Sequence, residues 1–134
     1  MSKIKMTVSA LANYLPEQSI AENNRFLWSY EITISNESEE VVQLLNRFWR
    51  ITDMTGHIEE IRGTGVIGLQ PVIKPKKKFA YTSFCQLVTP QGTMEGHYEM
   101  QTVEGESLFV IAIPKFILTS PITNFAGYHR SRLH

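Results

Sequence analysis

The stretch Phe26-Leu27-Trp28-Ser29-Tyr30-Glu31-Ile32-Thr33-Ile34-Ser35 decides the fold class of this chain. Large apolar side chains occupy every second position, and the positions between them are mainly polar. Successive side chains of a β-strand point to opposite faces, so this alternation predicts a strand with an aromatic and aliphatic inward face. Helical periodicity is nearly absent from the rest of the chain.

The segment 41–53 carries the same signal. It places Leu45, Trp49 and Ile51 on one face, and Arg47 falls on that face too, where it requires either a route to solvent or a partner. Further strands are predicted at residues 57–62, 79–84, 93–103 and 107–113, and near residues 116–118.

The run 108–113 is apolar throughout, which is typical of a central strand covered on both faces. Short strands separated by turns at intervals of about ten residues predict an all-β, antiparallel sandwich of about seven or more strands. The spacing Cys…Trp…Cys is absent, so the sandwich has no immunoglobulin-type disulfide. We expect a single domain over residues 1–134.

Composition excludes several classes of protein. The 134 residues are 43% apolar and 19% charged, with 13 basic and 13 acidic residues, so no net charge directs the chain to nucleic acid or to an anionic membrane. The single cysteine, Cys85, allows neither an intramolecular disulfide nor a zinc site built on cysteines. The N-terminus lacks a signal-peptide pattern and no apolar run is long enough to cross a bilayer, so we expect a cytoplasmic protein.

The stretch Gly63-Thr64-Gly65-Val66-Ile67-Gly68-Leu69-Gln70-Pro71 has the spacing G-x-G-x-x-G of a dinucleotide-binding turn. That turn requires a helix after the third glycine, whose N–H groups hold the pyrophosphate. Pro71 and Pro75 prevent a helix of useful length from following Gly68. The sequence therefore predicts a loop between strands and excludes a Rossmann unit.

Several separated motifs carry a family resemblance over most of the chain. They are Asn46-Arg47-Phe48-Trp49-Arg50-Ile51-Thr52-Asp53, the glycine segment ending in Gln70-Pro71, Ile73-Lys74-Pro75, Phe79-Ala80-Tyr81-Thr82-Ser83, Thr89-Pro90, Gly92-Thr93-Met94, Gly96-His97-Tyr98 and Leu133-His134. With these motifs in this order, the chain resembles the ApaG family. It departs from the family pattern at Lys76-Lys77-Lys78, where a Pro-Gly turn with an acidic residue is more usual, and at Phe84, where a glycine commonly precedes the cysteine.

The resemblance implies a fibronectin type III-like sandwich of about this length. It also implies a link to cobalt and magnesium tolerance and a glycine loop proposed to bind pyrophosphate, with no established catalytic residue. Eukaryotic relatives carry the domain on adaptor proteins, which implies a role in protein interaction.

The glycine loop has two interpretations. Glycines at positive φ expose successive N–H groups that bind anions, and nearby lysines would converge on a phosphate. Alternatively, the glycines only permit tight bends while the lysines protect an edge strand from aggregation. The residues of the anion hypothesis are Gly63, Gly65, Gly68, Lys74, Lys76, Lys77 and Lys78.

A weaker metal hypothesis concerns Glu95, His97 and Glu99, which share one face of a predicted strand. Two of them would ligate a divalent cation such as zinc, manganese or cobalt, with a third element completing the site. The alternative is an exposed polar face opposite buried Met94 and Tyr98.

We expect Cys85 to be a buried thiol rather than a nucleophile, and we find no catalytic constellation. The expected function is therefore that of a non-catalytic binding module, with another protein as its partner. The alternative is a domain that binds phosphate, pyrophosphate or a nucleotide through the glycine loop. Exposed strand edges would also allow a homodimer, and the sequence leaves the oligomeric state open.

Overall fold

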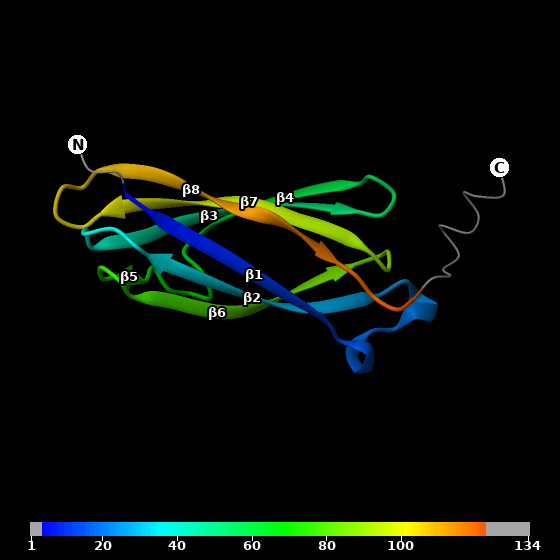
Figure 1. The fold of residues 1–134 in the computed structure, drawn as a ribbon. Helices are drawn as coiled ribbons and strands as arrows, with labels where there is room; N and C mark the ends of the chain where they lie inside the picture. The colour runs from blue at the N-terminus through cyan, green and yellow to red at the C-terminus, as the bar shows by residue number, and fades with distance from the viewer. Residues whose placement is uncertain (1–3, 123–134) are drawn as a thin grey trace.

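The computed structural model describes residues 4–122 as two antiparallel β-sheets packed face to face (Figure 1). The first sheet has the order β1-β2-β6, with β1 at Met6–Tyr14, β2 at Phe26–Asn36 and β6 at Lys78–Leu87. The second has the order β4-β3-β7-β8, with β3 at Val42–Asp53, β4 at Ile58–Thr64, β7 at Gly92–Thr102 and β8 at Leu108–Leu118; β5 at Val72–Ile73 also pairs with β3. Two short 3-10 turns, η1 at Pro16–Gln18 and η2 at Ala21–Asn23, link β1 to β2.

The prediction of an all-β antiparallel sandwich is confirmed. No described element is a helix that could span a membrane. The resemblance motif at residues 133–134 lies outside the described residues.

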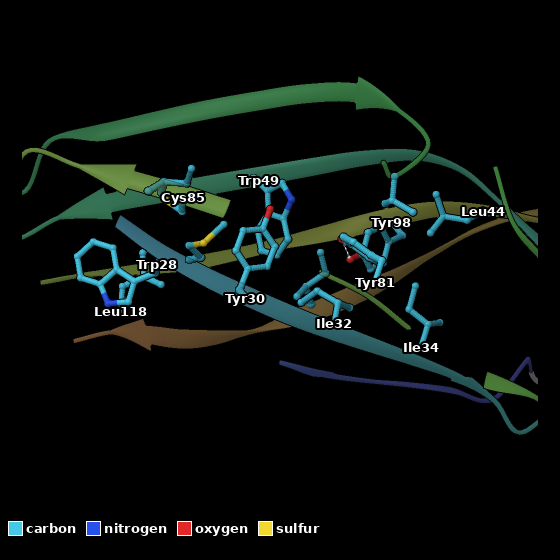
Figure 2. Close-up of a cluster of buried hydrophobic side chains, with 14 of the residues drawn as sticks. Trp28, Tyr30, Ile32, Ile34, Leu44, Trp49, Tyr81, Cys85, Tyr98 and Leu118 are labelled. Carbon is cyan, nitrogen blue, oxygen red and sulfur yellow. Dashed lines mark hydrogen bonds between the residues drawn. The ribbon is translucent and has the colours of Figure 1, made fainter. Parts of the chain in front are cut away.

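Strand β2 supplies the centre of the core, as its alternation predicts. The inward side chains Phe26, Trp28, Tyr30, Ile32 and Ile34 are all buried. Figure 2 shows several of them packed against side chains of the opposite sheet. The indole Nε1 of Trp28 is not left unsatisfied, because it donates a hydrogen bond to the carbonyl oxygen of residue 119 at 2.7 Å.

The inward face of β3 differs from the prediction at its start. Leu44 is fully buried and Leu45 only partly, whereas Trp49 and Ile51 face the core as expected. The physical reason is a register shift between Leu44 and Asn46 where β3 pairs with β7. An extra residue in one strand reverses which side chains point inward. Arg47 therefore lies on the core side of the sheet with Trp49.

Strand β8 is at the edge of its sheet, and the prediction of a central strand there was wrong. Leu108, Val110 and Ile117 are 74%, 61% and 66% exposed, so one face of the apolar run is open. Pro114 lies within β8 and cannot donate to a ladder, which suits an edge position. The segment 116–118 is the end of β8 rather than a separate strand.

The edge strands of the two sheets contact each other along one side of the sandwich, and a different pair of edge strands borders the other side. Strand β1, which the sequence analysis did not predict, alternates exposed and half-buried residues and lies beside β8, so these two strands cover one side of the sandwich (Figure 1). The edges on the other side are β4 and β6. The glycine segment lies at this second side, between Thr64 and the start of β5.

Candidate functional site

The glycine segment folds as a tight hairpin rather than a helix start. Val66 and Leu69 exchange backbone hydrogen bonds, each at 2.8 Å. The two residues between them have positive φ, 43° at Ile67 and 79° at Gly68, as a type I′ turn requires. The N–H groups of Ile67 and Gly68 donate to none of the described residues. The predicted loop between strands is confirmed.

The other two glycines are required for different reasons. A β-carbon on Gly65 would lie 2.2 Å from the backbone oxygen of Leu69, and Gly65 has a φ of 65°. Gly63 is in β4, without a positive φ, and a β-carbon there would lie 2.6 Å from Cζ of Arg47. Gly68 is required for its positive φ, Gly65 for both its φ and the space around it, and Gly63 for space alone, and the three do not form one continuous nest of N–H groups.

The guanidinium of Arg47 is held against the glycine segment. Its Nη1 donates to the carbonyl oxygens of Thr64 at 3.1 Å and Gly65 at 2.8 Å. Arg47 takes part in none of the ion pairs among the described residues, so its charge has no carboxylate partner within that part of the chain. A half-buried cation without a counter-charge is unusual, since burial disfavours an unpaired charge.

A hollow of about 210 Å³ lies between the sheets beside this guanidinium. Residues of the glycine turn line one part of it, and residues of β2, β3 and β6 line the rest. Its lining residues are Tyr30, Arg47, Trp49, Val66, Ile67, Gly68, Tyr81 and Ser83. The hollow therefore combines one cation with three hydroxyl groups and a turn that carries two free N–H groups.

The hydroxyl groups around the hollow stay neutral. Burial raises the pKa of Tyr30 and of Tyr81 above the usual value for tyrosine, and it also raises that of Tyr98, whose hydroxyl is hydrogen-bonded to the Tyr81 hydroxyl (Figure 2). Protonated phenols donate hydrogen bonds and add no negative charge. Arg47 therefore sets the sign of the charge in this site.

The four lysines of the anion hypothesis do not converge on the glycines. Lys76 instead donates to the carbonyl oxygen of Glu37 at 3.0 Å and forms an ion pair with Glu39 at 3.1 Å. Lys78 begins β6, an edge strand, while Lys74 and Lys77 lie in the turn between β5 and β6. None of the four lines the hollow. The lysines are close to the glycines in sequence, but β5 and the turn after it carry them away from the hollow.

The side chains of the metal hypothesis each contact a different neighbour. Within residues 4–122 no group of three or more His, Cys, Asp or Glu side chains is placed to hold a metal ion, so no third ligand completes this site. The three lie opposite Arg50, Phe48 and Asn46 of β3 in an unbroken register, so they share one face of β7 as predicted. The contacts are Glu95 to Lys115 at 3.7 Å, the His97 ring stacked on the Phe48 ring at 4.9 Å between centroids, and Glu99 Oε1 accepting from Asn46 Nδ2 at 2.9 Å.

Cys85 has the environment of a structural thiol. It is buried, and burial raises its pKa to about 12. A reactive cysteine needs a lowered pKa and an electropositive, accessible setting. The expectation of a buried thiol is confirmed.

Sequence reasoning missed Arg47 and the hydroxyls opposite it as site residues. The signal for Arg47 was present, because it stands on the inward face of a strand next to Trp49. No such signal marks Tyr30, Tyr81 and Ser83, whose shared position depends on how β2 and β6 face β3.

Comparison of the sequence with known proteins identifies the family of this chain. A model of the ApaG domain matches residues 16–102. The chain belongs to the ApaG family. The ApaG protein of Mesorhizobium japonicum is 52% identical over 110 residues, which cover 82% of this chain and 84% of that protein. The ApaG protein of Brucella anthropi is 50% identical over 114 residues, covering 85% and 87%.

Solved structures agree with the ApaG assignment. A crystal structure of a Bordetella pertussis protein given the name ApaA superposes with a TM-score of 0.85 at 38% identity, over 90% of this chain and 97% of that one. The matched ApaG segment contains every residue that lines the hollow, whereas β1 and β8 lie outside it.

Proposed function

We propose that this ApaG-family chain is a non-catalytic binding domain that takes a small phosphate-type anion, such as pyrophosphate, in the hollow beside the glycine turn. The single observation that carries the proposal is the guanidinium of Arg47, half-buried and without a carboxylate partner among the described residues. An anion in the hollow would supply the missing counter-charge.

The remaining donors suit an oxyanion. Only Nη1 of Arg47 is bonded within the described residues, so its Nε and Nη2 groups are left to bind a ligand. Paired guanidinium N–H groups match the oxygens of a phosphate. Ser83, Tyr30 and the turn at Ile67 and Gly68 add neutral donors on the other walls.

The size of the hollow limits the ligand. At about 210 Å³ it is smaller than the roughly 300–1,000 Å³ typical of sites for drug-sized molecules. A phosphate or pyrophosphate group fits this scale better than a whole nucleotide. Since no three-ligand metal site forms within residues 4–122, cobalt or magnesium would enter as a complex with the anion.

Calorimetric titration with pyrophosphate, with and without Mg²⁺ or Co²⁺, tests the proposal. Charge-assisted hydrogen bonds contribute about 1.5–3 kcal/mol, so Arg47→Gln should weaken binding about tenfold or more. Arg47→Lys should bind more weakly than wild type, because an ammonium cannot offer paired donors. Lys76→Gln is the matched control and should stay within about twofold of wild type. Equal affinity of wild type and Arg47→Gln would overturn the proposal.

A second candidate function, association with another polypeptide, is favoured by the free edge of β4. This strand is exposed at every residue except Gly63. Gly65 N–H donates to Leu45, and Asp53 N–H donates to His57, each across the β3–β4 pair. Alternate residues of an antiparallel strand turn their N–H and C=O groups toward the partner, so odd-numbered residues of β4 bond to β3.

The even-numbered residues Ile58, Glu60 and Arg62 therefore direct their backbone groups to the free edge. Thr64 does so too, but its carbonyl oxygen already accepts from Arg47. Such an edge accepts an added strand. Hydrogen exchange at the Glu60 and Arg62 amides tests this role, because a paired strand would protect both.

A further inference from the structure

We propose that two copies of this chain pair antiparallel through β4, about a two-fold axis at Ile61, and so join their larger sheets into one. The inference rests on the edge-pairing role of β4 proposed above and commits it to a second copy as the partner. It does not depend on anion binding. Its evidence is the self-complementary order of charges along the edge, Ile58-Glu59-Glu60-Ile61-Arg62-Gly63-Thr64.

Which residues of β4 turn their N–H and C=O groups outward restricts the register in which two copies of β4 can pair. Outward groups belong to even-numbered residues, so an even-numbered residue must face an even-numbered residue of the second copy. The axis must then pass through a residue of β4. Centring it on Glu59, Glu60 or Arg62 sets two like charges directly opposite each other, which is destabilising.

Centring the axis on Ile61 gives opposite charges instead. Glu60 then lies opposite Arg62 of the second copy, and symmetry repeats this contact. Both bonds that Arg50 makes to Glu60 use Oε2, at 3.0 and 2.8 Å, so Oε1 is not engaged within the described residues. Arg62 lies with its Cζ 4.4 Å from the centre of the Phe48 ring and belongs to none of the ion pairs there.

In the same register, the side of the paired strands that faces the core gains a second contact between charged groups. Glu59 lies opposite Gly63 of the second copy. Gly63 has no side chain, and the Arg47 guanidinium occupies the place of its β-carbon, 2.6 Å from Cζ. This register therefore brings the carboxylate of Glu59 toward the Arg47 guanidinium, where Glu59 and a bound anion are alternative counter-charges.

Disulfide trapping tests the geometry. In this register Ile61 faces its own copy in a pair without backbone hydrogen bonds, where Cα atoms are about 4.5 Å apart, within the range of a disulfide. Ile61→Cys should therefore form a covalent dimer on mild oxidation. Glu59→Cys is the matched control, because its two copies are separated by four positions, about 13 Å along the strand. Cys85 is buried and common to both variants.

Charge exchange tests the register independently through the dimer dissociation constant, measured by analytical ultracentrifugation. Glu60→Arg or Arg62→Glu replaces two attractive pairs with two repulsive ones, so each should raise the constant about tenfold. The double variant Glu60→Arg/Arg62→Glu restores opposite charges and should return to within about threefold of wild type.

A monomer at millimolar concentration, equal cross-linking at positions 59 and 61, or no recovery in the double variant would each overturn the second-copy assignment. If the Glu60 and Arg62 amides are then protected only in cell extract, the edge pairs with a different chain and the proposed edge role survives. If they are protected in neither condition, the edge role fails as well.

Discussion

The guanidinium of Arg47 fills the space that a side chain on Gly63 would occupy, with Cζ 2.6 Å from the position of the absent β-carbon. The first glycine of the motif therefore serves a cation rather than a bend. It lets Arg47 reach across β4 and bond the carbonyl oxygens of Thr64 and Gly65. The glycine motif and Arg47 thus form one structural unit, although they come from the neighbouring strands β4 and β3.

Substitution of Gly63 should weaken ligand binding while changing the stability of the fold little. In Gly63→Ala the three atoms nearest the new methyl group all belong to the guanidinium of Arg47, and we expect this end of a flexible side chain to move away and lose its bonds to Thr64 and Gly65. We expect a loss of unfolding free energy of at most about 1 kcal/mol, together with weakened pyrophosphate binding. Urea unfolding and calorimetry on the same sample measure the two effects. An alanine variant with unchanged affinity would show that the position of Arg47 is irrelevant to binding.

Gly65→Ala should behave in the opposite way. Its β-carbon would collide with the backbone of Leu69 and would sit on a residue with a φ of 65°, so the hairpin itself must shift. A strained backbone position and a steric clash together cost about 2–4 kcal/mol or more. Gly68→Ala, which has a φ of 79° and open space around it, is the intermediate case at about 1 kcal/mol. A loss of unfolding free energy in Gly65→Ala no larger than the losses in Gly63→Ala and Gly68→Ala would contradict these assignments.

The buried hydroxyls of Tyr81 and Tyr98 should be coupled. They bond to each other between the two sheets, and removing one leaves the other unsatisfied. Tyr81→Phe and Tyr98→Phe should each lower the unfolding free energy by about 1–2 kcal/mol, while the double variant should lose less than the sum. A double-mutant cycle by urea denaturation measures the coupling. Strict additivity would mean that the hydroxyls do not depend on each other.

Asn36 should be the most costly polar side chain to remove. It is buried, donates to the carbonyl oxygens of Glu40 at 2.7 Å and Ile73 at 2.9 Å, and accepts from Ser38. Asn36→Ala leaves these buried groups unpaired, at a cost of about 2–3 kcal/mol. The control is Asn46→Ala, a half-buried residue whose hydrogen bond to Glu99 is exposed to solvent, and it should change stability by less than about 0.5 kcal/mol. Similar losses of unfolding free energy in Asn36→Ala and Asn46→Ala would contradict the special role of the Asn36 hydrogen bonds.

Stability should fall at alkaline pH. The Cys85 thiol ionises near 9.0 in an unfolded chain and near 12 when folded, because burial raises its pKa. The folded state is therefore favoured fully below pH 9, and this advantage is lost as the pH rises toward 12. Unfolding free energies at pH 8, 9 and 10 check the trend, and Cys85→Ala should show a smaller decline between pH 9 and 10. An increase in stability over that interval would contradict the assigned environment.

Strand β2 was predictable because its alternation is uninterrupted, and the loop at Gly63–Gly68 was predictable because Pro71 forbids a helix. The inward position of Leu44 was not, since the register shift that creates it belongs to the pairing of β3 with β7. Pro114 was a local sign that β8 lies at an edge, but its apolar neighbours outweighed it.

The separation of the four lysines from the hollow has a related reason. Four lysines are close to the glycines in sequence, yet Lys76 pairs with Glu39 at another turn, while Arg47 contacts the turn from a neighbouring strand. The pairing of β3 with β4 decides which charged side chain contacts the glycine turn, and this pairing cannot be read from a single sequence.

The most direct measurement is an NMR titration of the isotopically labelled chain with pyrophosphate, which follows backbone amides and arginine Nε–H groups together. Binding at the proposed site should shift the Arg47 Nε–H signal and the amides of Ile67, Gly68 and Ser83 with one common dissociation constant. Shifts confined to Lys74–Lys78, or no shift of Arg47 at millimolar pyrophosphate, would contradict the account.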